Sequence, residues 1–373
     1  MTTVLTASGS AEFLGLVPAL AGFTPHESIV LLPFRGKRAH GAMRLDLPSD
    51  DVDLDRYVET AIALVSRVTA TDAVAVVVYT DERALATRDG LVLPAAVAVD
   101  DLLDCAEDVG LRIVDALCVT PEGWASYLDA EPALAPLGDI PAPPAAARPG
   151  DIAGDQLAGA ELPRIDLAEK ERVGTALRGL NEVLAHDAAG RLTGGEHPQA
   201  LAAAVLLDDI PAFFEMLLAE PDTLPPFATA ALLWCLDRPI FRDVALTQWA
   251  TDVGHGIGIL EAQLAYSHSG TAIPDDLGAV FLGQGPKPDP ARLGRALTIA
   301  RHAAARAPRD SRPGPLTAAA WLSWALGRSS HAAHYLDLVR EIDPEYGLAA
   351  LLSSMISAAM LPAWAFQRGE AVT

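Results

Sequence analysis

The sequence predicts an α/β N-terminal domain, with a mixed, mainly parallel sheet that carries an antiparallel hairpin, followed by an all-helical domain. Three observations lead to this fold class. Residues 8–128 alternate strand-like and helix-like apolar patterns, residues 132–163 are dense in Pro, Ala and Gly, and the remainder repeats helical spacing. Alternation indicates an α/β sheet, and a Pro-rich stretch without periodicity indicates a linker. We expect domains at 1–131 and 165–373, joined by a linker or strap at 132–164.

The first elements are a short helix and a hairpin. Ser8 or Ser10 is placed to cap a helix that ends at Gly22. Two strands follow, 28–34 and 39–47, joined by a turn that contains a glycine. Side chains alternate along a strand, so Ala42, Arg44 and Asp46 share one face of the second strand and Met43, Leu45 and Leu47 share the other.

Two helix–strand units complete the α/β half. Apolar residues recur at helical spacing over 54–68, and a helix is expected over 95–109. The Val-rich run 73–79 is typical of a strand that is covered on both faces, and residues 111–119 return to strand. Because crossover helices join strands that run parallel, we expect a parallel core. The order of the strands cannot be derived from the pattern.

The C-terminal half is helical throughout. Asp166 is placed to cap a helix through Leu184, and a glycine-rich run at 254–258 predicts a break in a helix over 244–263. The last part resembles a tetratricopeptide helix pair, with a Gly turn at 327 and Asp-Pro at 343–344. The other expected helices are 198–207, 210–219, 227–236, 291–306, 316–326, a helix that ends at 342, and 346–360.

Composition narrows the classes of function. The 373 residues are 51% hydrophobic and carry a net charge of −22, which argues against nucleic-acid binding because that depends on Lys and Arg neutralising phosphates. A cluster of arginines at 301–312 is interpreted as a solvated helix end. Three scattered cysteines argue against disulfides and a Cys-rich zinc site. The N-terminus lacks a signal-peptide pattern and the apolar runs are too short to cross a bilayer, so we expect a soluble, cytoplasmic protein.

Candidate ligand-binding residues follow from where ligands bind in open α/β sheets, beyond the carboxyl ends of parallel strands. Asp81 and Glu82 follow one expected strand and are candidate bases or ligands. Trp124 and Tyr127 follow another and are a candidate apolar wall. The alternative is that they are loop charges and an aromatic anchor.

Arg44 and Asp46 share a strand face and either grip a ligand or form a structural ion pair. These two and the four preceding residues are our ligand-binding candidates.

Three further patterns favour structural interpretations. His26, Glu27 and Ser28 are consecutive, and side chains of an extended segment point in opposite directions, so a turn explains them better than a catalytic triad. His331 and His334 share a helix face but lack a third zinc ligand, and the glycines at 254–258 lack the Lys-Ser/Thr of a phosphate loop. We expect no cofactor and no metal site, apart from Mg²⁺ in the acidic loops if the domain is an enzyme.

Several segments resemble the actinobacterial DUF4192 family. They are Gly22 to Val30 (GFTPHESIV), Arg44 to Pro48 (RLDLP), the strand that ends at Tyr79, Trp124 with Tyr127-Leu128, and the end with Asp343 to Tyr346 and Pro362. The resemblance extends over nearly the whole chain. Family members often carry neighbouring cysteines after the Tyr-Leu, but residues 131–138 here have none, so no thiol or metal role is expected there. The resemblance implies no assigned activity.

Two hypotheses about function follow. The first is an interaction or assembly protein that binds other protein chains or itself, because no complete catalytic constellation is visible and helical-hairpin domains mostly offer surfaces for other chains. The second is an enzyme or small-molecule sensor with a ligand site at the strand ends of the α/β domain. The sequence favours the first by a small margin.

Overall fold

The computed structural model describes residues 7–88, 90–143, 154–191 and 195–366. The chain forms two compact units, 1–159 and 160–373. The boundary falls inside the segment predicted as a linker, of which residues 144–153 lie outside the described part.

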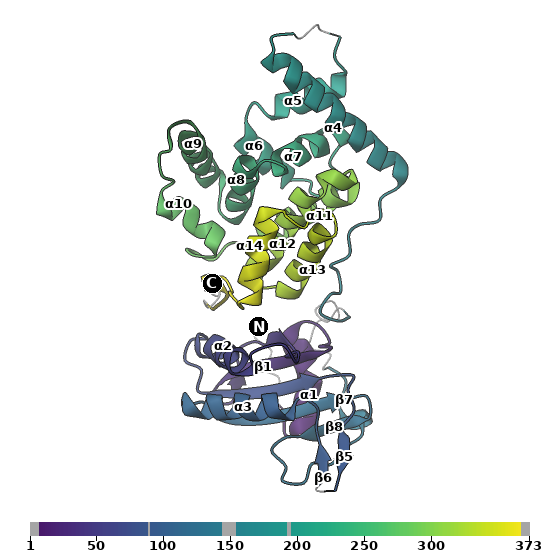
Figure 1. The fold of residues 1–373 in the computed structure, drawn as a ribbon, viewed down its shortest axis with the longest axis vertical. Helices are drawn as coiled ribbons and strands as arrows, with labels where there is room; N and C mark the ends of the chain where they lie inside the picture. Colours follow the sequence, from purple (N-terminus) through teal and green to yellow (C-terminus); the bar gives the residue numbers. More distant parts are fainter. Residues whose placement is uncertain (1–6, 89, 144–153, 192–194, 367–373) are drawn as a thin grey trace. The chain divides into compact units, whose positions relative to one another are not determined.

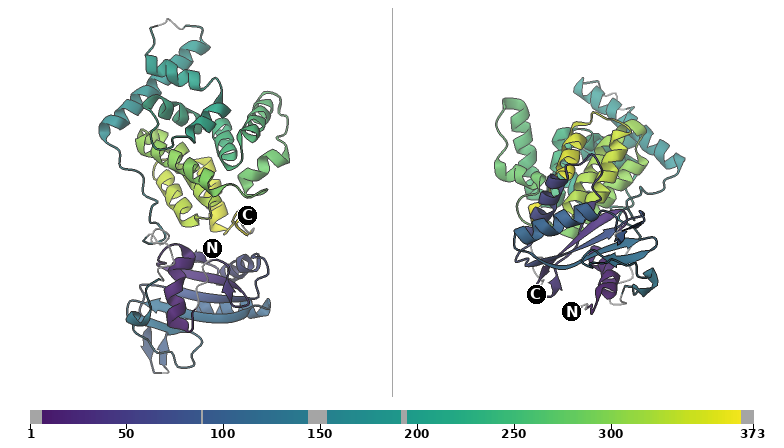
Figure 2. Two further views of the ribbon diagram at one scale, coloured as in Figure 1. Left: turned by 180° about the vertical axis from the view of Figure 1, so that it is seen from behind. Right: turned by 60° about the horizontal axis from the view of Figure 1, so that its bottom comes forward.

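The first unit is an α/β sheet with helices on both faces (Figures 1 and 2). The strand order is β2-β1-β4-β7-β8, and β3 also pairs with β1. A separate small hairpin, β5 with β6, follows β4 in the chain. The strands of the sheet are β1 (Ser28–Arg35), β2 (Arg38–Ala39), β3 (Met43–Asp46), β4 (Ala73–Tyr79), β7 (Arg112–Thr120) and β8 (Gly123–Ser126), and the hairpin strands are β5 (Leu85–Thr87) and β6 (Gly90–Val92). The predicted mixed sheet is confirmed.

The expectation that the sheet is mainly parallel is wrong, because among the described strands of the sheet one pairing is parallel and the others are antiparallel. Only β4 and β7 are parallel neighbours, whereas β1 pairs antiparallel with both β3 and β4. Because β3 and β4 both run opposite to β1, they run in the same direction as each other. The crossover over α2 (Leu54–Ser66) thus joins strands of one direction, as expected, but it passes over β1, which lies between them.

Helices cover the two faces of this sheet with separate cores. One face packs α2 and α3 (Ala96–Asp108), and the other packs α1 (Ser10–Ala21), which Figure 2 shows in its left view. The Val-rich β4 is buried on both faces, as its composition predicts. Gly22 ends α1 in the left-handed conformation, as predicted. The predicted cap is wrong, because Gly9 is the N-cap and makes no side-chain cap bond.

The predicted second strand of the hairpin, 39–47, is two short strands. Gly41 has a φ of 120° and lies between β2 and β3. Glycine adopts this positive φ without strain, and the conformation interrupts the pairing with β1. The predicted faces hold, because Ala42 packs with the α1 core and Met43 and Leu45 pack with the α2–α3 core.

The second unit is helical. Its apolar core includes four fully buried tryptophan and tyrosine side chains, which are Trp249, Trp321, Trp324 and Tyr335. The helices are α4 (Leu167–Ala188), α5 (Pro198–Leu206), α6 (Ile210–Leu217), α7 (Pro226–Leu236), α8 (Pro239–Ala250), α9 (Val253–Ser269), α10 (Asp275–Ala279), α11 (Pro290–Arg306), α12 (Pro313–Ala325), α13 (Ser329–Arg340) and α14 (Gly347–Ser357). In the described part of the chain, no helix has the length and apolar character needed to cross a membrane.

The break predicted at glycines 254–258 lies earlier. α8 ends at Ala250, and the Asp252 side chain caps α9 by accepting a hydrogen bond from the His255 amide. The glycines are inside α9 because this cap fixes the first helical residue at Val253, one residue before the first glycine.

Candidate functional site

The candidate site lies where β1 begins and β4 ends. These strands are antiparallel and pair Ser28 with Tyr79, so the residues just before β1 and just after β4 meet at one edge of the sheet. His26 and Glu27 come from the first segment and Asp81 from the second. Residues that are more than fifty positions apart in the sequence are thus brought together by strand register.

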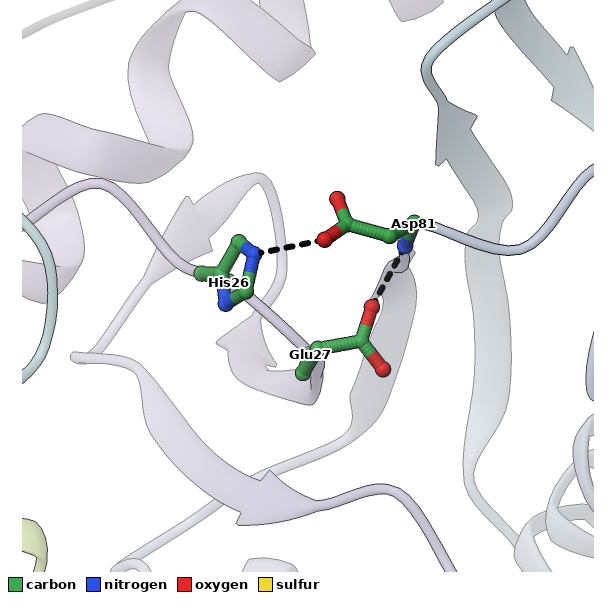
Figure 3. A group of neighbouring side chains, drawn as sticks. All are labelled: His26, Glu27 and Asp81. Carbon is green, nitrogen blue, oxygen red and sulfur yellow. Dashed lines mark hydrogen bonds and ion pairs between the residues drawn. The ribbon is translucent and has the colours of Figure 1, made fainter.

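The three side chains converge in space (Figure 3). His26 Nε2 lies 3.1 Å from Asp81 Oδ2. The Glu27 carboxylate accepts a hydrogen bond from the Asp81 backbone amide. The side chains of His26 and Asp81 are 55% and 74% exposed, so the group is open to solvent and to a ligand.

The backbone of Glu27 explains why neighbouring side chains meet. Glu27 has a φ of 43°, in the left-handed region. For a residue with a side chain this conformation costs about 1–2 kcal/mol. In an extended segment His26 and Glu27 would point in opposite directions, but the left-handed residue turns the chain and both side chains reach Asp81. The chain turns at this place, as predicted, and the turn brings His26 and Glu27, but not Ser28, into the group with Asp81.

Hydrogen bonds from the Arg44 and Ser28 side chains hold the segment that precedes β1. Arg44 Nε donates to Ser28 Oγ at 2.7 Å, and Ser28 Oγ donates to the His26 carbonyl at 2.6 Å. Arg44 also pairs with Asp46 at 2.6 Å. The Arg44 side chain is only 14% exposed, so its guanidinium supports the His26 backbone and is not presented to solvent.

Gly154 and Gln156, which follow the sheet in the chain, hold the His26 segment through further hydrogen bonds. The Gln156 side chain accepts from the His26 amide at 3.2 Å and donates to the His26 carbonyl at 2.9 Å. The Thr24 amide donates to the Gly154 carbonyl at 2.8 Å. Backbone groups on both sides of the His26 side chain are therefore fixed by residues distant in sequence, which pre-organises the site.

On the α1 face, the row of paired residues next to the candidate site contains two polar residues, two aromatic residues and a valine. Strand pairing places Asp46, Ser28, Tyr79, Val119 and Trp124 opposite one another in that order across five strands. Paired residues lie on the same face. Burial raises the pKa of Tyr79 well above its usual range, so its hydroxyl stays protonated at neutral pH.

Trp124 and Tyr127 do not form one wall. Trp124 packs in the core under α1, whereas Tyr127 packs in the α2–α3 core and donates to the Pro94 carbonyl at 2.5 Å. The two residues are three positions apart, and an odd spacing on an extended chain places side chains on opposite faces. Burial raises the pKa of Tyr127, which suits a structural hydroxyl.

The other candidate, Glu82, lies outside the convergent group. Its backbone amide donates to Thr80 Oγ1 at 3.1 Å and its side chain is exposed. The loop after β7 repeats this turn, with the Glu122 amide donating to Thr120 Oγ1 at 3.3 Å. Arg83 and Glu122 join the two loops through an ion pair of 3.4 Å. Glu82 is therefore next to Asp81 in the sequence, but its carboxylate does not belong to the convergent group.

The chemistry of the group fits a divalent transition metal. Each of the three residues offers one ligand atom, and the three atoms lie within 4.8 Å of one another. Ligands about 2.1 Å from one zinc ion lie about 3–4 Å apart, so the exposed His26 and Asp81 side chains and the half-buried Glu27 side chain need to close by only about 1 Å. Imidazole with carboxylates suits Zn²⁺, Fe²⁺ or Mn²⁺ better than Mg²⁺. Among the described residues, this is the only such group of three or more.

The remaining patterns from the sequence do not form sites. Four arginines donate to backbone carbonyls and are held within the fold: Arg301 to Glu161, Arg306 to Leu224, Arg309 to Glu341 and Arg312 to Ala307. The three cysteines are free, and burial raises the pKa of each thiol, so they are poor nucleophiles.

Two residues of the site, His26 and Glu27, were missed as ligands by the sequence reasoning. Asp81 was a candidate because it follows a recognisable strand, β4, which ends at Tyr79. The signal for the other two was their place just before β1, whose antiparallel partner β4 ends two residues before Asp81, and this signal requires the strand order.

Comparison with protein families gives one match. The model for the family described as "Domain of unknown function (DUF4192)" matches residues 11–272, which include the whole α/β sheet and the helices through α9. Neither the curated proteins nor the solved structures provide a match to this chain.

Proposed function

The chain belongs to the DUF4192 family, whose description assigns no function, and we propose that its α/β unit binds a divalent transition-metal ion at His26, Glu27 and Asp81. The ion holds a small ligand that offers oxygen atoms, such as a carboxylate or a phosphate. This is the ligand-site hypothesis for the strand ends. The convergence of one imidazole and two carboxylates on a pre-organised backbone is the observation that carries it.

The number of protein ligands distinguishes a structural metal site from a catalytic or ligand-binding one. Three protein ligands leave coordination positions open, as in catalytic and ligand-binding metal sites, whereas structural zinc sites are closed by four. With a neutral imidazole the group carries two negative charges, which favours a cation. An ion there would polarise a bound oxygen or lower the pKa of a bound water, so the site supports ligand sensing or hydrolysis.

Calorimetric titration of the full chain with ZnCl₂ and, separately, MnCl₂ and MgCl₂ tests the proposal. We expect one site per chain, with zinc bound more tightly than magnesium. His26→Ala and Asp81→Asn each weaken zinc binding at least tenfold, because second-sphere changes alone already cost about 10–100-fold in metal sites.

The matched control is Glu82→Gln, which removes the same kind of charge one residue from Asp81. It should leave zinc affinity within a factor of two or so of wild type, because its carboxylate is outside the group. If Glu82→Gln weakens binding as much as Asp81→Asn does, the binding is diffuse attraction to acidic loops, and the proposed site is wrong.

We also propose that the helical unit binds protein chains, as the interaction hypothesis states. One observation supports it: a large part of α9 is exposed and apolar, including Ile257 at 45%, Leu264 at 49% and Tyr266 at 56%. Apolar surface of this kind commonly marks interaction sites. Affinity capture with wild type and with an Ile257→Glu variant tests the hypothesis. The hypothesis is wrong if no protein is retained by wild type and lost with the variant.

A further inference from the structure

Helix α9 is unusual for a helix with so much exposed surface. Of its 17 residues only Gly256 and Ile259 are buried. A helix that faces solvent on most sides normally carries many charged residues. α9 has one Asp, Glu, Lys or Arg, which is Glu261, although the whole chain has a net charge of −22.

Four apolar residues form a narrow line along this helix, which we call the α9 seam: Val253, Ile257, Leu260 and Leu264. Their spacing is four, three and four residues, which is the spacing of the contact positions of a coiled coil. Val253, Ile257 and Leu264 are 39%, 45% and 49% exposed, and Leu260 is partly buried. α9 lies at the margin of its unit, beside α8, and no other helix among the described residues of the unit covers its outer side (Figures 1 and 2).

The seam is complementary to itself. The spacing of four, three and four reads the same in both directions, so a second copy laid antiparallel presents the same line. In that register Val253 meets Leu264 of the second copy, and Ile257 meets Leu260 of the second copy. Every seam residue then contacts another seam residue, which is the property of a two-fold symmetric interface.

Charge also favours a second copy at this place. Two molecules that each carry a charge of −22 repel one another, so they associate best through a surface that is almost free of charge. The seam contains no charged residue, and Glu261 lies on its flank, opposite the glycine at 256 in the antiparallel register. No carboxylate of one α9 faces a carboxylate of the other.

We propose that a second copy of this chain docks on the α9 seam in an antiparallel, two-fold arrangement. The proposal rests on the interaction function given above and names the partner. A single pair of helices buries less surface than a standard interface, so the dimer forms reversibly with a dissociation constant in the micromolar range.

Sedimentation equilibrium of the purified full chain tests the proposal. Wild type should move from one to two chain masses as its concentration is raised. The double variant Ile257→Glu with Leu264→Glu should stay at one chain mass, with an unchanged circular dichroism spectrum and melting temperature, because both side chains are exposed. Val205→Glu, at a 64% exposed apolar residue of α5, is the matched control and should dimerise as wild type does.

Cross-linking tests the register. In a Cys105→Ala background, Val253→Cys combined with Leu264→Cys should give a disulfide-linked dimer upon mild oxidation. Val253→Cys alone should not, because its two copies are separated by 11 residues along the pair, about 16 Å. Efficient cross-linking of Val253→Cys alone would overturn the antiparallel arrangement.

Monomeric wild type at every concentration would overturn the dimer, and so would a dimer that the seam variant leaves intact. Both results use purified protein only. They are therefore distinct from failure of the wider interaction hypothesis, which is decided by the capture experiment with a different partner.

Discussion

At the scale of single residues, the candidate site depends on one backbone conformation. Glu27 in the left-handed region brings its own carboxylate and the His26 imidazole to the same side. Strain of this kind persists only where surrounding contacts fix it. Here those contacts come from Ser28, Arg44 and Gln156.

Arg44 provides a test of this support. Arg44→Ala should lower the free energy of unfolding by about 1.5–3 kcal/mol, because it removes charge-assisted hydrogen bonds from a mostly buried position. Zinc affinity should fall less than with His26→Ala, because Arg44 does not touch the ion. Urea unfolding and calorimetry measure the two effects.

Arg83→Ala is the control for that substitution. Its side chain is 77% exposed and pairs with Glu122 at the surface, so we expect a change within about 0.5 kcal/mol. Loss of zinc binding by Arg44→Ala without loss of stability would contradict a supporting role and would make Arg44 a ligand-binding residue.

A second residue-scale prediction concerns pH. Two hydrogen bonds from Arg292 hold the pKa of Glu215 below its ordinary value of 4.5. A carboxyl group whose pKa is lowered by folding stabilises the fold fully above its unfolded-state pKa, and the stabilisation is lost as pH falls through the lowered folded-state pKa. Glu215→Gln should therefore lower the free energy of unfolding by about 1–2 kcal/mol at neutral pH, a range reduced for the partial exposure of the carboxylate.

This loss should shrink toward zero in strongly acidic solution, where Glu215 is protonated in the wild type as well. Denaturant unfolding at several pH values measures it. Glu171→Gln, in the exposed pair with Arg178, serves as the control with little effect at any pH. A loss for Glu215→Gln that is independent of pH would show that the carboxylate charge is not what stabilises the contact.

At the scale of elements, the contact between α8 and α9 depends on a glycine. A Cβ atom at Gly256 would overlap with Oε1 of Gln248 and lie too close to its Cβ atom. Gln248 is fully buried, and its amide nitrogen donates to the Pro211 carbonyl at 2.8 Å, so it has no room to move. Gly256→Ala should destabilise the protein by about 1–3 kcal/mol through overpacking.

Gly294→Ala is the control, because a Cβ atom at that position of α11 meets no atom within 4 Å. It should stabilise by about 0.5–1 kcal/mol through the lower helix cost of alanine. Thermal unfolding of the two variants measures both effects. Equal melting temperatures would mean that α8 and α9 do not pack as closely as described.

The same element shows how far sequence reasoning reaches. Periodicity predicted most helices and strands because apolar spacing directly reflects the face that each element buries. It placed the break between α8 and α9 at the glycines, whereas the cap at Asp252 decides it. The short strand β8 and the hairpin of β5 and β6 were missed, because three or four residues are too few to show a period.

At the scale of the whole molecule, the sequence predicts classes of structure but not their arrangement. The succession of an α/β region and a helical region was readable from periodicity. The position of β1 between β3 and β4 was not readable from periodicity, because strand order depends on pairing between residues that are distant in the chain. The candidate site was therefore only partly predictable: local pattern singles out Asp81 among its three residues, whereas His26 and Glu27 are brought to Asp81 by that pairing.

X-ray absorption spectroscopy at the zinc edge, on full-length protein loaded with one equivalent of zinc, identifies the ligands of the proposed metal ion. We expect a first coordination shell with one imidazole nitrogen and otherwise oxygen, and no sulfur. We also expect His26→Ala to remove the imidazole signal. A shell with sulfur, or with two or more imidazoles, would place the ion elsewhere in the chain and contradict the site at His26, Glu27 and Asp81.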